Sequence, residues 1–281
     1  MFDAGPLGYL SLAAHGHADA LAVTVSSGET DLVVDPGTGS YFRRPDVREA
    51  FRGTGFHPTI SIDSLDQSTP GGPFLWSRHA RSWFTRVDLQ GVVSGEQDGY
   101  LSLADPVRHQ RALVALEPTL IVVYDRLEAE GTHTASLRWP LHPSVEATLE
   151  VPATVRANMK HARLLLTFAA TVEGNLSVDR GVESPFLGWY SPRLEELVPA
   201  PLVRWESSFS GKLDVVTILC PLTDEPWPEV EPAVRRRDTA AEISLDGTFD
   251  SKTLYIDFDH AGGVVKPIAS HGHWVRSGGE R

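Results

Sequence analysis

Short runs that alternate polar and apolar residues, separated by turn-forming residues, constrain this chain more than any other feature of its sequence. β-Branched and aromatic side chains recur in these runs, and 24 glycines and 20 prolines interrupt them. Alternation with a period of two is typical of antiparallel sheets with one covered face. The pattern therefore predicts an all-β fold, a large antiparallel β-sandwich of stacked sheets. The predicted strands include Arg111–Leu116, Leu120–Tyr124, Thr134–Trp139, Leu164–Phe168, Val215–Leu219 and Thr253–Phe258.

The 281 residues are enough for one large β-domain covering residues 1–281. The alternative is that a smaller C-terminal sheet layer begins near residue 200. Helical character is expected over Phe42–Arg52, and Gly181–Pro201 is expected to be the longest irregular insert. The single cysteine, Cys220, excludes an internal disulfide and is expected to be a small buried apolar residue.

The charge and hydropathy of the chain limit the classes of partner that we expect it to bind. A net charge of −12 argues against nucleic acid, because phosphate binding requires a basic surface. The sequence contains no run of about 18–20 apolar residues and no basic, hydrophobic leader, so we expect no membrane span, no signal peptide and a soluble chain. The cellular location stays open.

Three histidines and an aspartate lie at the ends of probable strands near the N-terminus. Leu21–Val25 and Leu32–Val34 flank a turn-like cluster and together predict a β-hairpin. His17 precedes the first strand and Asp35 follows the second, so these side chains are expected to meet at the open end of the hairpin. His57 stands before another alternating run and is expected to join them.

Two imidazoles and one carboxylate suit zinc, which leaves a fourth position for water or another ligand. His15 and His17 lie two residues apart, so spacing alone does not decide which of them binds metal. The alternative is that these are polar strand-end residues held by hydrogen bonds. Asp19 is expected to be a turn residue, with a role as hydrogen-bond acceptor for a metal ligand as the alternative.

Three further residues are candidates for binding an acidic saccharide. Arg52 ends a helical stripe with Arg44 and Arg48, which predicts either an anion clamp or a solvated face. Trp76 is a candidate for stacking on a sugar ring, and the alternative is that it is buried in packing. Arg78 follows two residues later and is a candidate for the same binding surface. A second HGH, at residues 271–273, is interpreted as incidental because no carboxylate-bearing hairpin follows it.

An ordered set of motifs gives the chain a family resemblance. The chain resembles the C-terminal β-domain of the heparinase II/III-like polysaccharide lyases over about half its length. Pro58 departs from the pattern, because family members more usually carry asparagine after the histidine. The motifs are FDAGPLG (Phe2–Gly8), HGHADAL (His15–Leu21), VVDPGTGSY (Val33–Tyr41), FRGTGFHPTI (Phe51–Ile60) and DQSTPGGPFLW (Asp66–Trp76).

The resemblance implies cleavage of a uronate-containing polysaccharide or oligosaccharide by β-elimination. It makes His15 catalytic and assigns His17, Asp35 and His57 to a structural zinc. In this family a helical toroid precedes the β-domain and supplies a tyrosine, and we identify no tyrosine here that a motif places opposite His15. We therefore expect weak or no lyase activity without a toroid domain. The resemblance allows a periplasmic or secreted location.

Two other classes of function stay open. One is a non-catalytic, carbohydrate-binding β-sandwich held together by zinc, and the other is a zinc-dependent hydrolase whose open metal position carries a water.

Overall fold

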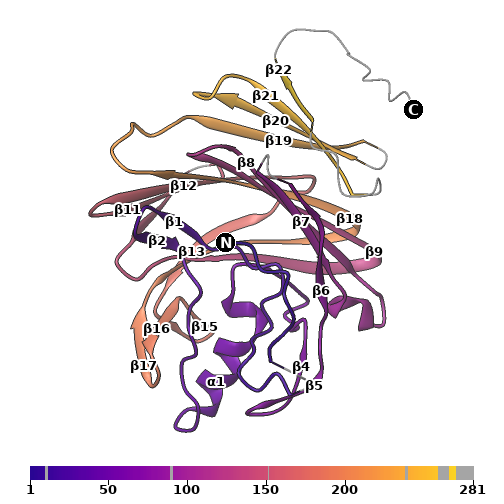
Figure 1. The fold of residues 1–281 in the computed structure, drawn as a ribbon, viewed down its shortest axis with the longest axis vertical. Helices are drawn as coiled ribbons and strands as arrows, with labels where there is room; N and C mark the ends of the chain where they lie inside the picture. Colours follow the sequence, from indigo (N-terminus) through magenta and orange to yellow (C-terminus); the bar gives the residue numbers. More distant parts are fainter. Residues whose placement is uncertain (10–11, 89–90, 151, 238–239, 259–265, 270–281) are drawn as a thin grey trace.

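Two long strands, β9 (Leu120–Pro140) and β18 (Pro201–Leu222), form the centre of the fold in the computed structural model (Figure 1). The structure describes residues 1–9, 12–88, 91–150, 152–237 and 240–258, and the backbone of residues 266–269. The two strands pair antiparallel, with a bulge between Ser210 and Lys212. The predicted strands at 120–124 and 134–139 are therefore parts of one strand, because the polar segment between them continues the pairing with β18 instead of turning.

Ten strands of the described chain form the large antiparallel sheet around this pair. Its main order is β10-β11-β12-β18-β9-β8-β7-β6, and β13 and β3 add to the sheet beside β18 and β9. Its other members are β3 (Ile60–Ile62), β6 (Ser82–Val87), β7 (Val92–Gln97), β8 (Arg108–Glu117), β10 (Glu146–Glu150), β11 (Thr154–Met159), β12 (Ala162–Ala170) and β13 (Asn175–Arg180).

A smaller antiparallel sheet covers one face of the large sheet (Figure 1). Alternate residues of β9 and β18, such as Val122 and Ile218, are buried in one cluster with Ile243 and Leu254 of the smaller sheet. Cys220 is buried in the same cluster, as expected for a small apolar side chain. The stacked sandwich is therefore confirmed. The smaller sheet contains β19 (Val230–Arg237), β20 (Ala240–Gly247), β21 (Lys252–Asp257) and β22 (Lys266–Ala269).

The opposite face of the large sheet carries the N-terminal part of the chain. The alternate set of β9 residues, including Val123 and Trp139, packs there against Val23, Leu32 and Ile60. Because successive side chains of a strand point to opposite faces, the middle of the large sheet is buried on both sides. The elements on this side are β1 (Val25–Ser27), β2 (Thr30–Val33), α1 (Pro45–Arg52), the 3₁₀ helices η1 (Thr54–Phe56) and η2 (Gly99–Ser102), β4 (Thr69–Gly72) and β5 (Leu75–Arg78).

Three boundaries differ from the sequence-based expectations. The hairpin β1–β2 forms, but its first strand begins at Val25, because Leu21 adopts φ +63° in a turn closed by the hydrogen bond from Ala22 N–H to the Asp19 carbonyl. The helix begins at Pro45 rather than Phe42, since proline is favoured in the first turn.

The insert at 181–201 is largely regular and forms two hairpins, β14 (Val182–Glu183) with β15 (Phe186–Leu187) and β16 (Trp189–Arg193) with β17 (Glu196–Pro199). The second HGH lies outside the described residues. In the described part of the chain, no helix has the length and apolar character needed to cross a membrane.

Candidate metal centre

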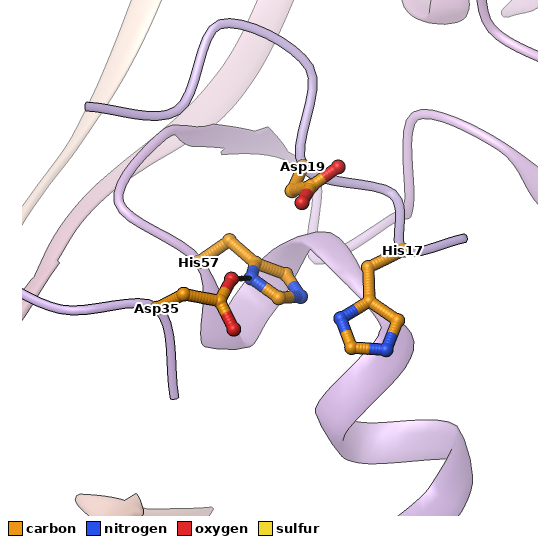
Figure 2. Close-up of side chains that lie close together, drawn as sticks. All are labelled: His17, Asp19, Asp35 and His57. Carbon is orange, nitrogen blue, oxygen red and sulfur yellow. Dashed lines mark hydrogen bonds and ion pairs between the residues drawn. The ribbon is translucent and has the colours of Figure 1, made fainter. Parts of the chain in front are cut away.

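Four side chains from three separate loops converge beside the open end of the β1–β2 hairpin (Figure 2). Each of them offers one potential ligand atom, and these atoms all lie within 4.8 Å of one another. The structure thus brings together the three residues that the hairpin argument selected, and it adds a fourth. The four residues, called the four-residue cluster below, are His17, Asp19, Asp35 and His57.

His57 is the buried member of the cluster and lies directly after η1, with no exposed surface. Its Nε2 lies 2.9 Å from the Phe51 carbonyl oxygen, which can only accept, so Nε2 carries a proton and donates it. Its Nδ1 lies 2.9 Å from Asp35 Oδ2. Burial by itself would lower the pKa of His57, but the Asp35 carboxylate outweighs burial and raises this pKa to about 9. Without metal, Nδ1 donates its proton to Asp35, and a metal would bind Nδ1 in place of that proton, with the other ring N–H fixed on a carbonyl.

His17 faces His57 across the cluster, with ring centroids 5.1 Å apart. Burial, together with the charge of His57, lowers the pKa of His17 to about 3, so its imidazole is neutral near pH 7. Its Nε2 is buried and has no hydrogen-bond partner among the described residues. A neutral imidazole fits a metal ligand, because metals bind the deprotonated nitrogen.

The two carboxylates of the cluster differ in pKa. Burial favours a higher pKa for Asp35, but the charge of His57 and its hydrogen bond lower that pKa to about 2. Burial raises the pKa of Asp19 to about 6. Asp19 is both a turn residue, through its carbonyl, and a member of the cluster, through its carboxylate. Two imidazoles and two carboxylates make a donor set suited to zinc.

The loop that carries Asp35 is held by the β16–β17 hairpin. Glu195 at the tip of this hairpin accepts hydrogen bonds from Ser40 Oγ and from the Tyr41 N–H, at 2.7 and 3.0 Å. Gly37 has φ +87°, and a Cβ there would lie 2.5 Å from the Ser191 carbonyl oxygen. The glycine is thus required by close approach of the hairpin backbone, and the insert from residue 181 onward positions the loop.

His15 lies next to the cluster but is exposed to solvent. Its Nδ1 is 2.9 Å from Tyr41 Oη, and the edge of its ring contacts Phe74 at a centroid distance of 6.0 Å. The structure therefore places a tyrosine beside His15, which the sequence analysis did not anticipate. The sequence signal was the last residue of the VVDPGTGSY motif, but the contact spans 26 residues and depends on how the Glu195-held loop folds back.

The arginine stripe is mostly buried rather than solvated. Arg44 is exposed and pairs with Asp46, whereas Arg48 and Arg52 are each 1% exposed. Arg48 lies 5.2 Å from the Tyr41 ring centroid. Arg52 pairs with Glu49 at 2.8 Å and covers the Trp76 ring at 4.7 Å. Arg52 therefore does not present an open anion clamp, because Trp76 and the surrounding core remove it from solvent.

Trp76 and Arg78 also point to structural roles in this geometry. Trp76 is 6% exposed, with Arg52 over one face, so its ring is not open to a sugar. Arg78 donates to the Gly99 and Gln67 carbonyl oxygens at 2.9 and 2.8 Å. Among the described tryptophans, Trp83 is 41% exposed.

Comparison with known proteins matches the first three-quarters of the chain to one family model. The model described as "Heparinase II/III-like, C-terminal" matches residues 1–203. No curated protein sequence matches the chain.

Several solved structures share the fold. A heparinase III gene product has a TM-score of 0.74 and 15% identity, and the match covers 91% of this chain and 38% of that protein. Heparan sulfate lyase HepC from Pedobacter heparinus has a TM-score of 0.71 and 15% identity, with 97% of this chain covering 39% of that one. This chain thus spans about two-fifths of the length of the enzymes it resembles.

Proposed function

Because the chain belongs to the heparinase II/III-like C-terminal family, we propose that it is the β-domain of a polysaccharide lyase that cleaves uronate-containing polysaccharides by β-elimination. The observation that carries the proposal is the exposed His15–Tyr41 pair beside the four-residue cluster. An exposed imidazole hydrogen-bonded to a phenol can exchange a proton with a bound ligand, whereas the buried histidines of the described chain cannot reach one.

The proposed reaction needs two proton transfers and one charge stabilisation. A base removes the proton from C5 of the uronate, the electron pair forms the C4–C5 double bond, the C4–O4 bond breaks, and an acid protonates O4. His15 acts at the uronate carboxylate or at the transferred proton, and Tyr41 shares a proton with its Nδ1. A positioned acid or base typically contributes about 10²–10⁴-fold to the rate, and stabilisation of the developing carboxylate charge contributes more.

The four-residue cluster holds a structural zinc in this proposal. When bound, zinc supplies a rigid connection between the three loops that bring the cluster together. Gly16 separates His15 from His17, so fixing His17 also fixes the backbone that carries His15. Four protein donors favour a closed structural site over a hydrolytic one, because a hydrolase keeps one metal position open for water.

A groove beside the segment that carries His15 is the proposed saccharide-binding surface. It has a volume of about 550 Å³ and is lined by Leu7, Gly8, His79, Arg81 and Trp83, among others. Its Leu7 wall packs tightly against Gly16, because a Cβ on Gly16 would lie only 1.8 Å from the Leu7 carbonyl oxygen. An exposed indole and a guanidinium match a sugar ring and its carboxylate. Arg81 and Trp83 therefore replace Arg52, Trp76 and Arg78 as the proposed substrate contacts.

Ultraviolet absorbance of unsaturated uronate products tests the proposal. The chain alone should give little or no product from heparan sulfate or alginate oligosaccharides, and the chain joined to a helical toroid domain should give rapid turnover. In the joined protein, His15→Ala and Tyr41→Phe should each lower turnover by about 10²–10⁴-fold. Rapid turnover by the chain alone would contradict the incomplete site, and zinc-dependent ester or amide cleavage without ultraviolet product would favour the hydrolase.

A further inference from the structure

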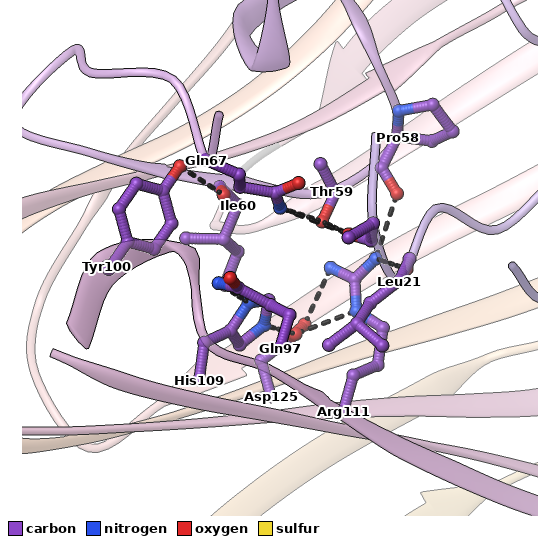
Figure 3. A network of polar contacts seen from close by, with 11 residues as sticks. Leu21, Pro58, Thr59, Ile60, Gln67, Gln97, Tyr100, His109, Arg111 and Asp125 are labelled. Carbon is purple, nitrogen blue, oxygen red and sulfur yellow. Dashed lines mark hydrogen bonds and ion pairs between the residues drawn. The ribbon is translucent and has the colours of Figure 1, made fainter. Parts of the chain in front are cut away.

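Arg111 is a fully buried arginine on β8, and its guanidinium lies between Asp125 and the backbone of Leu21 and Pro58 (Figure 3). Its Nε and Nη2 donate to the two carboxylate oxygens of Asp125, at 2.7 and 3.0 Å. Its Nη1 donates to the carbonyl oxygens of Leu21 and Pro58, each at 2.8 Å. One guanidinium thus connects a central strand of the large sheet to two loops.

These two carbonyl groups belong to the backbone segments that carry candidate ligands. Pro58 directly follows His57, and Leu21 lies two residues after Asp19. Leu21 has φ +63°, a left-handed conformation that a leucine adopts only when surrounding contacts impose it. Arg111 is one such contact, because it orients the Leu21 carbonyl towards the sheet.

Asp125 is itself held on its other side. His109 donates from Nε2 to Asp125 Oδ1 at 2.8 Å, and Gln97 Nε2 approaches His109 Nδ1 at 3.4 Å. Burial lowers the pKa of His109, so this imidazole is neutral and its Nδ1 accepts from the amide. The Gln97 Oε1 then accepts from the Gly99 N–H at 2.6 Å. Each of these side chains is oriented by the next one, so the Arg111 guanidinium is held in one orientation.

We propose that Arg111 is a positioning residue for the metal centre, connecting the segments after Asp19 and His57 to Asp125. The inference rests on the metal-binding part of the proposed function. A buried ion pair contributes little net stability, since desolvation offsets its attraction, so stability alone does not account for this one. Four directed donors in one plane are specific to arginine, and a lysine ammonium at this position cannot reach both carbonyls and both carboxylate oxygens.

Zinc titration of Arg111→Lys tests the inference against a matched control. Arg236 is the control because it pairs with the buried Asp214 at 2.7 and 2.8 Å on the opposite face of the sheet. Arg111→Lys should lower zinc affinity about 10–100-fold, the usual effect of losing a residue that orients metal ligands, and should alter the visible absorption of the Co²⁺-substituted protein. Arg236→Lys should lower the free energy of unfolding and leave the zinc affinity and the Co²⁺ spectrum unchanged.

The outcomes separate this inference from the proposed function. Wild-type protein that binds no zinc overturns the metal centre and the inference together. Wild-type protein that binds zinc, with Arg111→Lys giving the same affinity and Co²⁺ spectrum, overturns the inference alone. If Arg111→Lys does not fold, Asp125→Asn replaces it, because this isosteric change loosens the same fork; an unchanged zinc affinity and spectrum in that variant would equally overturn the inference.

Discussion

The two faces of the large sheet each bury an arginine–aspartate pair, and the pairs differ in where their remaining hydrogen bonds go. Asp125 on β9 and Asp214 on β18 both have no exposed surface, and they lie on adjacent strands, where Val215 is the register partner of Asp125. Asp125 faces the N-terminal loops and pairs with Arg111. Asp214 faces the smaller sheet and pairs with Arg236 of β19.

The Arg111 network holds loops against the large sheet, whereas the Arg236 network joins the two sheets. Arg111 uses its third nitrogen on two backbone carbonyls, whereas Arg236 uses its third nitrogen on the Glu128 carboxylate at 3.1 Å. Tyr124 also donates to Asp214, at 2.5 Å, so this second network consists of side chains between two layers. Backbone contacts fix the course of a loop, and side-chain contacts between layers fix how the layers stack.

Removing either aspartate is the strongest way to test this division. Asp125→Ala should lower the free energy of unfolding by about 3–5 kcal/mol, because it leaves the buried Arg111 guanidinium without a carboxylate. Asp214→Ala should lower it by less, because Arg236 is partly exposed and keeps its ion pair with Glu128. Denaturant unfolding measures this loss. Zinc titration under native conditions should show weaker binding for Asp125→Ala alone. Equal loss of zinc affinity in Asp214→Ala would show that the two faces are not independent.

Zinc itself should stabilise the loop face of the sheet by a smaller amount. At a free zinc concentration of 100 Kd, the wild-type protein should gain about 2.7 kcal/mol of unfolding free energy, because the folded cluster binds the ion and the unfolded chain does not present it. His17→Ala should abolish this gain. His161→Ala, in the exposed turn between β11 and β12, is the matched control and should keep it. A zinc-dependent gain that survives in His17→Ala would place the ion elsewhere.

Much of the fold could be predicted from the sequence because period-two alternation reports directly on strands with one covered face. The runs around Leu164 and Thr253 both lie in observed strands, β12 and β21. The merger of two predicted strands into β9 could not be predicted, because the polar segment around Gly131 reads as a turn and its pairing with β18 lies more than 70 residues away. A local stretch of sequence indicates where turns are favoured, but it does not indicate which distant strand will pair with it.

The candidate site was predictable in which residues meet and not in the packing that brings them together. His17 and Asp35 do lie at the open end of one hairpin, but β1 begins only at Val25, so the turn at residues 19–22 and not the symmetry of the strands brings His17 to Asp35. The approach of Tyr41 to His15 depends on Glu195, which comes from a distant insert. The burial of Arg48 likewise depends on aromatic neighbours that helical spacing cannot reveal.

A third polar contact, on the loop side of the sheet, should show a pH dependence opposite in sign to that of the His109–Asp125 contact in the Arg111 network. His133 Nδ1 and Nε2 lie 2.6 Å from Asp63 Oδ2 and 2.9 Å from Asp105 Oδ2. Burial acts to lower the pKa of His133, but the hydrogen bonds to both carboxylates outweigh it and raise this pKa. Since the folded pKa exceeds the unfolded value of about 6.5, the stabilisation is complete below pH 6.5 and is lost as the pH rises through the folded pKa.

The substitution His133→Gln tests this pH dependence, and of the substitutions considered it should change the free energy of unfolding least. At pH 5 the variant should be less stable than the wild-type protein by about 1 kcal/mol, the usual contribution of a hydrogen bond, and the difference should shrink at alkaline pH. Urea unfolding at several pH values measures the difference, and His161→Gln should show none. Burial lowers the pKa of His109, so the His109–Asp125 contact should show the opposite trend and lose stability as the pH falls through the unfolded value of about 6.5. A constant difference between the wild-type protein and His133→Gln would show that His133 acts by packing rather than by charge.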